Sequence, residues 1–288
     1  MEEPKPIQKH LVPPFLLAIV FFIIALIFRI IDIFILQLHM TPFSIISSKV
    51  IPLIILLGYV WIVYRRFNVV GIHYHFLISN LVLGFLVYLA YYLLPFLAEF
   101  YIELGLGLEP LLQLAFYPTP YIMYFFIFYI INSFMEEGVF RGLMMRCFMT
   151  KYNVNIANGI QAVFFGIWHI VWPINYLING WMDPITAGWF SVYYVVSSFG
   201  FGIVTGYMFQ KTRSLTGPIV LHTLWNFTIF MSVITYGVPP GWAVNIFLYG
   251  TMLAVEYIGL AITFLIIKEF SRQRKLPELT PWDATLPN

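Results

Sequence analysis

Three polar patterns interrupt strongly apolar stretches of this sequence, and their residue types suit hydrolytic chemistry. MEEGVFRG at 135–142 carries two glutamates and an arginine, FFGIWH at 164–169 ends on a histidine, and LHTLWN at 221–226 holds a histidine and an asparagine. Glutamate and histidine activate water by exchanging protons with it. Histidine and asparagine donate hydrogen bonds that stabilise a developing oxyanion. Charged groups inside a membrane are costly and usually face a wet cavity, so these patterns indicate a functional site.

The glutamate pair is expected to divide its roles. Residues four apart on a helix are neighbours, so Glu137 can be held as an ion pair by Arg141. Glu136 lies about 100° further round the helix and has no such cation at hand. We therefore expect Glu136 to be unpaired, partly buried and available as a general base. The alternative is that EExxxR forms the solvated cytoplasmic rim of a span, which the nearby Arg146 and Lys151 favour.

The two histidine patterns each place polar and aromatic groups on one helix face. Phe165 and His169 are four apart, as are His222 and Asn226. His222 and Asn226, stacked one turn apart, could cradle an oxyanion. Taken singly, each pattern is explained as well by interhelical hydrogen bonds. Their combination with a spare glutamate, on three separate spans, favours a shared catalytic site.

The composition identifies lipid as the solvent of most of the chain. Hydrophobic residues make up 61% and charged residues 10%, against roughly 45–50% and about 25% in average soluble domains. The net charge of +2 is too small to indicate a nucleic-acid partner. The single cysteine, Cys147, excludes an internal disulfide. We interpret Cys147 as a small apolar residue rather than a nucleophile.

The apolar runs predict an all-α membrane protein, a bundle of about eight transmembrane helices. The whole chain, 1–288, reads as one polytopic domain with cytoplasmic ends at 1–10 and 269–288. With both termini inside, thirteen of the fifteen lysines and arginines fall on the cytoplasmic side. Only Arg29 and Lys49 fall outside. The expected spans are 11–28, 48–64, 76–98, 117–136, 154–172, 186–209, 215–235 and 243–267.

The depths of the site residues within their spans lead to a further structural expectation. His169 lies deeper in its span than His222 does, and Glu136 must meet both. We therefore predict that the fourth helix continues past Glu136 to about residue 149. We also predict that Arg141 points inward rather than into the cytoplasm.

EExxxR, FxxxH and HxxxN, in this order on membrane helices, resemble the type II CAAX prenyl protease family. This family is the Ras-converting-enzyme group of intramembrane endopeptidases. The resemblance covers about 136–226, and all its motif positions are present: Glu136, Glu137, Arg141, Phe165, His169, His222 and Asn226. It implies cleavage of a C-terminal CAAX sequence after prenylation of its cysteine, with release of the last three residues.

The resemblance also implies roles for these residues and partners for the protein. Glu136 would activate water, His169 would hold that water, and His222 and Asn226 would form the oxyanion hole. Glu137 and Arg141 would stabilise the site, without a metal cofactor. The partners would be a prenylated CAAX protein or peptide and membrane lipid. The location would be the plasma membrane of a prokaryote or the endoplasmic reticulum membrane of a eukaryote.

Two alternatives remain open at this point. Glu136, His169 and His222 could form a His₂Glu zinc site with a position left for water, although no HExxH motif is present. A non-proteolytic transporter or scaffold could use intramembrane Glu and His as a proton relay, which Glu256 would extend. We find no internal repeat of the kind that many transporters show.

Overall fold

The computed structural model describes residues 12–38, 43–107, 110–114, 119–236, 242–272 and 279–282. Within these ranges the fold is helical apart from one pair of short strands. Seven described helices are long and apolar enough to cross a membrane: Pro14–Ile35, Phe43–Tyr64, Leu77–Gly105, Pro120–Phe148, Val154–Ile178, Pro184–Thr212 and Phe247–Arg272. The predicted all-α membrane bundle is confirmed.

Several of these long helices are built from consecutive segments. The first three comprise α1 (Pro14–Ile30) with η1 (Ile31–Ile35), then α2 (Phe43–Ile45), η2 (Ile46–Val50) and α3 (Ile51–Tyr64), and then α4 (Leu77–Tyr88), η4 (Leu89–Leu93) and α5 (Leu94–Gly105). The fourth comprises α6 (Thr119–Glu137), η5 (Gly138–Met145) and α7 (Arg146–Phe148), and the fifth comprises α8 (Val154–His169) and α9 (Val171–Ile178). The sixth is α10 (Pro184–Thr212), and the last is α12 (Trp242–Arg272). A short 3₁₀ turn, η3 (Phe67–Val70), precedes α4.

The seventh expected span, 215–235, is shorter than predicted. It corresponds to α11 (Thr216–Met231), which has 16 residues and so a length of about 24 Å. A hydrocarbon core is about 30 Å thick. The chain leaves the helix because Ser232–Tyr236 form β2, which pairs antiparallel with β1 (Pro110–Leu114).

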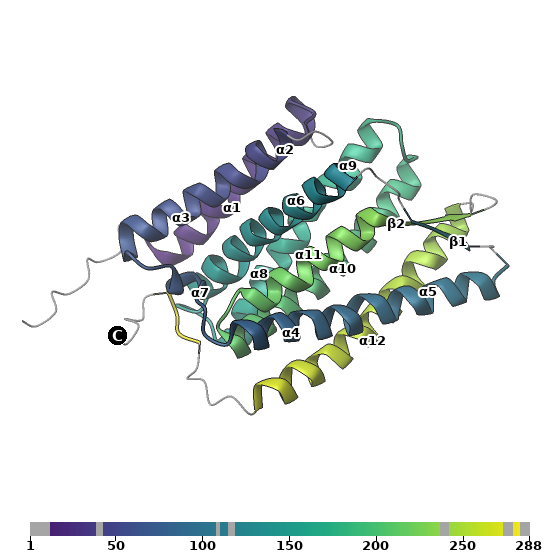
Figure 1. Ribbon diagram of the computed structural model, residues 1–288. Coiled ribbons are helices and arrows are strands. Elements are labelled where there is room, and N and C mark those ends of the chain that lie inside the picture. Colours follow the sequence, from purple (N-terminus) through teal and green to yellow (C-terminus); the bar gives the residue numbers. More distant parts are fainter. Residues whose placement is uncertain are drawn as a thin grey trace, which may run out of the picture.

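The helices form a central group flanked on two sides (Figure 1). Figure 1 shows α6, α8, α10 and α11 in the middle, with α1 and α3 along one flank and α4, α5 and α12 along the other. The packing agrees, because α8 and α12 contact α10, α4 and α6 contact α11, and α1 contacts η5. The two strands lie at one end of the bundle and α7 lies near the other.

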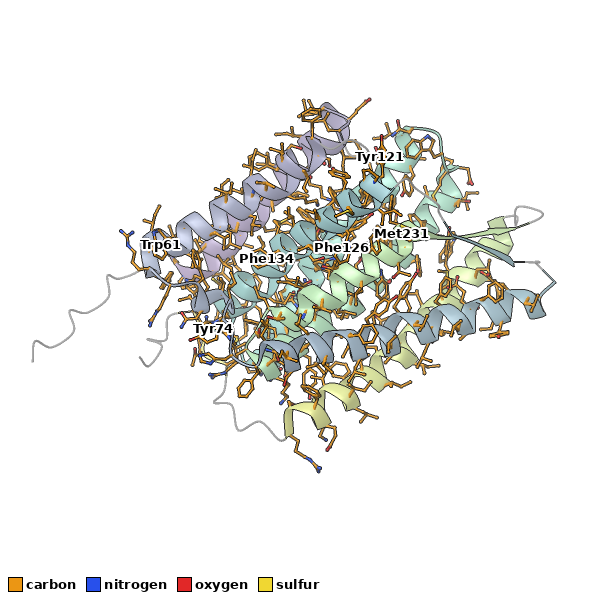
Figure 2. All side chains as sticks on the ribbon, viewed as in Figure 1. Trp61, Tyr74, Tyr121, Phe126, Phe134 and Met231 are labelled. Carbon is orange, nitrogen blue, oxygen red and sulfur yellow. The ribbon has the colours of Figure 1, made fainter. Side chains whose placement is uncertain are left out.

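The surface of the bundle is apolar and its interior holds many polar groups. Ile78 is 77% exposed and Leu265 67% exposed. Figure 2 shows side chains along the outer faces of the helices, with Trp61 near one end and Tyr121 near the other. By contrast, Asn80, Gln161 and Arg141 are buried. This distribution, with seven apolar helices, is that of an integral multi-pass membrane protein.

The fourth helix extends as far as predicted. It runs through α6, η5 and α7 to Phe148, twelve residues beyond Glu136. Arg141 is fully buried, so it points inward. The prediction that both termini are cytoplasmic stays a prediction, because residues 1–11 and 283–288 lie outside the described residues.

Two parts of the predicted cytoplasmic boundary are more ordered than expected. The last helix continues to Arg272, whereas the last span was expected to end at 267 and the cytoplasmic end to begin at 269. Arg146, expected at a solvated rim, is buried and donates to the main-chain oxygens of Val69, Thr280 and Pro281. Trp282 is also buried, and its main-chain N–H donates to the Arg146 carbonyl. Residues 279–282 therefore close over the end of the fourth helix.

Side-chain caps define where α8 and α10 begin. The Asn153 side chain accepts a hydrogen bond from the Ile156 N–H at 3.0 Å. Asp183 accepts hydrogen bonds from the N–H groups of Ile185 and Thr186. Hydrogen bonding from Thr186 also holds the pKa of the Asp183 carboxyl below its usual value. Such caps satisfy orphan N–H groups and fix the register of the helix that follows.

Small residues bring α8 and α10 into close contact. A Cβ on Gly202 would lie 2.9 Å from the Cβ and 3.0 Å from the Cα of Ala162. A Cβ on Gly166 would lie 2.8 Å from the Val195 carbonyl oxygen. Close backbone approach through small residues is typical of membrane helix pairs. It sets the position of α8, which ends at His169.

The α8–α10 contact gives a matched pair of substitutions. Gly202→Val should lower the thermal stability of the purified protein in detergent by about 1–3 kcal/mol, because the backbone of α8 must move away. Gly188→Val lies on the same helix, where a Cβ would meet nothing within 4 Å. It should leave the melting temperature nearly unchanged. Equal melting temperatures for the two variants would contradict this account of the packing.

Candidate active site

A single cavity collects most of the residues that the sequence patterns identified. It has a volume of about 390 Å³, and its wall includes Glu136, Phe165, His169, His222 and Asn226. These residues come from α6, α8 and α11. The side chains therefore meet, although up to 90 residues separate them in the chain. Glu137 and Arg141 lie behind this wall, both fully buried.

Glu137 is fixed from two sides. Arg141 Nε lies 3.2 Å from its Oε2, the predicted pair with four-residue spacing. His222 Nδ1 lies 2.7 Å from its Oε1. The alternative of a solvated rim is wrong, because Glu136 is 2% exposed and Glu137 and Arg141 are 0% exposed. Glu137 thus positions the His222 ring.

Phe165 connects this ion pair to the two imidazoles. The Arg141 guanidinium carbon lies 4.1 Å from the centre of its ring, which is cation–π distance. The rings of His169 and His222 lie edge-on to Phe165 at 4.6 Å and 6.0 Å. The aromatic ring therefore stabilises the buried cation and restricts both histidines.

The hydrogen bonds of the histidines define which nitrogen faces the cavity. His169 Nδ1 lies 2.8 Å from the Phe165 carbonyl oxygen. A carbonyl only accepts, so Nδ1 carries the proton and Nε2 of the neutral ring has a lone pair. His222 Nδ1 likewise donates to the Glu137 carboxylate. Its Nε2 lies 3.7 Å from Glu136 Oε2, too long for a direct hydrogen bond.

Glu136 is paired, which corrects the expectation from the sequence. Arg29 Nη1 lies 3.4 Å and Lys49 Nζ 3.5 Å from its Oε1. Both cations are buried, Arg29 at 3% and Lys49 at 7% exposed. The sequence analysis did not predict these two ion pairs, because four-residue spacing identifies only neighbours on the same helix. Arg29 and Lys49 come from α1 and η2.

The helices that carry Arg29 and Lys49 are longer than expected. Both cations lie inside long helices, Pro14–Ile35 and Phe43–Tyr64, whereas the expected spans placed Arg29 just beyond the end of 11–28 and Lys49 at the start of 48–64. The missed signal was an ionisable residue within an apolar run, FIIALIFRIIDIFI, which by itself points to a polar partner inside the bundle.

The other groups that the sequence singled out lie apart from this network. Glu256 accepts a hydrogen bond from the Tyr193 hydroxyl at 3.1 Å, which supplies the partner that the sequence did not identify. Cys147 is fully buried. Among the residues that the structure describes, no three His, Cys, Asp or Glu side chains are grouped so as to hold a metal ion.

The fold and the cavity together define an integral multi-pass membrane protein with a buried glutamate–histidine site. Residues 118–228 match the family of Rce1-like type II CAAX prenyl endopeptidases. The resemblance seen in the three motifs is thereby confirmed for this segment, which is less than half of the 288-residue chain. No curated protein matches the chain. The similarity indicates a peptidase and supports CAAX-type intramembrane protease activity in general.

The buried ion pair gives a prediction for stability. Arg141→Met should destabilise the protein by about 3–5 kcal/mol, because Glu137 would keep a buried charge without its cation. Arg272→Met is the matched control, since Arg272 is 73% exposed and pairs with Glu269 at 2.8 Å. An exposed pair contributes about 0–1 kcal/mol. Denaturation of both variants in detergent measures the difference, and equal losses would contradict a structural role for the buried pair.

Proposed function

We propose that this protein hydrolyses the peptide bond after the prenylated cysteine of a CAAX sequence and releases the C-terminal tripeptide. The observation that carries this proposal is the cavity that Glu136, His169, His222 and Asn226 line together. The similarity of residues 118–228 to CAAX endopeptidases supplies the substrate class. The partners are then a prenylated CAAX protein or peptide and the membrane lipid around it.

The first proposed step is the activation of water. Arg29 and Lys49 contact Glu136 Oε1, whereas Oε2 is buried without a hydrogen-bond partner among the described residues. Oε2 accepts a proton from water, while the lone pair of His169 Nε2 orients the same water. The resulting hydroxide adds to the scissile carbonyl carbon. This is general base catalysis by a positioned carboxylate.

The second proposed step is the stabilisation of the oxyanion that forms. Asn226 Nδ2 donates to this oxygen, together with His222 Nε2. Because His222 Nδ1 already donates to Glu137, donation from Nε2 requires the imidazolium form. Two carboxylates next to the ring, at 2.7 and 3.7 Å, balance that charge. Donors fixed before the reaction in a water-poor site stabilise the transition state most effectively.

The final proposed step breaks the C–N bond. The tetrahedral intermediate collapses, and Glu136 returns its proton to the leaving amine nitrogen. The hydroxyl proton of the intermediate passes through Glu136 to the same nitrogen, so the products are the new carboxylate of the prenylcysteine and the protonated amine of the tripeptide. All atoms are balanced by one water, without a covalent enzyme intermediate.

The cavity wall also suits a substrate that carries a lipid. Much of it is aromatic, with contributions from α6 and α11: Tyr124, Phe125, Phe128, Tyr129, Trp225 and Phe230. Apolar walls with a few convergent polar groups are typical of sites for amphipathic small molecules. The polar groups are gathered around Glu136, where the peptide bond would react.

The charges at the site favour the metal-free mechanism over the zinc alternative. A His₂Glu zinc site would use Glu136, His169 and His222 as ligands. Two cations already contact Oε1 of the Glu136 carboxylate, and they would repel a dication bound to the same carboxylate. We therefore propose that no metal cofactor takes part.

Replacement of the proposed base tests the mechanism. Glu136→Gln and His169→Ala should each lower kcat for a prenylated CAAX peptide by about 10²–10⁴-fold, because acid–base catalysis contributes this much. A chelator should leave the wild-type rate unchanged. Glu269→Gln, at an exposed carboxyl, should retain full activity. Loss of wild-type activity to the chelator with recovery on adding zinc would support the zinc alternative instead.

Replacement of the proposed oxyanion donor is a separate test. Asn226→Ala should lower kcat by about 10²–10³-fold with little change in KM, because the interaction forms only in the transition state. Asn68→Ala, at an exposed position of η3, changes the same residue type away from the cavity and should leave kcat within about threefold. An increase in KM alone for Asn226→Ala would assign the residue to substrate binding.

A further inference from the structure

Two cations contact Glu136 from helices that precede the segment similar to the CAAX endopeptidases. Arg29 is on α1 and Lys49 on η2, whereas the matching segment begins at residue 118. Both contacts go to the same oxygen, Oε1, at 3.4 and 3.5 Å. None of the three sequence motifs includes either cation.

The contacts divide the two oxygen atoms of the Glu136 carboxylate. Oε1 is occupied by both cations. Oε2 is buried without a hydrogen-bond partner among the described residues, and it lies on the side of His222 Nε2. A carboxylate fixed through one oxygen has little rotational freedom left. The other oxygen is thereby directed toward the reacting water.

The cations also compensate the charge of a buried carboxylate. Glu136 is 2% exposed, so burial alone would favour its protonated form, which cannot act as a base. Arg29 and Lys49 are held in turn by the Trp168 ring, whose centre lies 4.4 Å from Arg29 Cζ and 5.8 Å from Lys49 Nζ. Asp32 interacts electrostatically with both cations and accepts a hydrogen bond from Ser44 at 2.7 Å.

We propose that Arg29 and Lys49 are positioning residues that keep Glu136 ionised and direct its Oε2 toward the water. They act through Glu136 and do not bind the substrate. The proposal rests on the proposed function, since it takes Glu136 as the base. It extends the active site to the first two long helices of the chain.

The geometry distinguishes this role from recognition of the substrate's C-terminal carboxylate. In a CAAX substrate that carboxylate lies three residues beyond the scissile bond, which is about 10 Å in an extended chain. Arg29 and Lys49 directly contact the base, which must itself reach the scissile bond through one water. Their charge is also already balanced by Glu136 and Asp32. Both facts favour positioning over substrate binding.

The kinetic test uses two peptides, a prenylated CAAX peptide with a free C-terminal carboxylate and the same peptide as its C-terminal amide. Lys49→Met and Arg29→Gln should each lower kcat by about 100-fold, because a displaced catalytic group loses this much. KM should stay within about threefold. The loss should be equal for the acid and the amide. Lys49→Arg and Arg29→Lys keep the charge and should recover part of kcat.

The controls and the contradicting results follow from the same design. Lys151→Met and Arg272→Gln remove exposed cations and should retain wild-type kcat. A loss confined to the acid peptide and expressed in KM would overturn the proposal and assign the cations to substrate binding. Wild-type kinetics in Lys49→Met and Arg29→Gln would also overturn it.

A stability cycle tests the contact without any peptide. Lys49→Met should lower the melting temperature by several degrees more in the Glu136 protein than in the Glu136→Gln protein, because only the former keeps a buried carboxylate. Equal losses in the two backgrounds would show that Lys49 does not act on Glu136, and would overturn the proposal.

If the wild type cleaves neither peptide, the proposed function fails and the catalytic role of the cations fails with it. The cycle would still decide whether the cations hold Glu136.

Discussion

The repulsion between two adjacent buried carboxylates is the constraint on which this structure depends. Glu136 and Glu137 are consecutive and at most 2% exposed, so their charges must be compensated inside the protein. Arg141 compensates Glu137 within the fourth helix, whereas Arg29 and Lys49 reach Glu136 from the first and second long helices. His222 contacts both carboxylates from α11. Four separate helices are thereby tied to one pair of residues.

Aromatic rings of α8 extend this compensation to the cations themselves. Arg141 lies over Phe165, and Arg29 lies over Trp168. A buried guanidinium has more donors than one carboxylate can accept, and the ring face offers negative potential on its remaining side. Phe165 and Trp168 lie four residues and one residue before His169 on the same helix. The helix that carries the proposed water-holding histidine therefore also stabilises the charges around the proposed base.

The parts of the site that depend on local helix geometry could be predicted from the sequence. The pairing of Glu137 with Arg141 follows from a spacing of four, and the long fourth helix follows from the depths of the two histidines. The pairing of Glu136 could not be predicted in this way, since Arg29 is 107 residues and Lys49 87 residues away in the sequence. The count of charges on the two sides of the membrane assigned these cations to the non-cytoplasmic side and gave no hint of a shared partner. The early end of α11 could not be predicted either, because it depends on pairing between β2 and the distant β1.

The charge network also limits what the segment similar to CAAX endopeptidases can do alone. Residues 118–228 contain the proposed base, the water-holding histidine and the oxyanion donors. Without α1 and η2, however, His222, at 3.7 Å, would be the one ion-pair partner of Glu136 left among the described residues. A carboxylate buried beside a second carboxylate would then favour protonation, and the proposed base would be lost. For this reason we propose that the first two long helices, which share no motif with the site, are part of the active site rather than a membrane anchor for it.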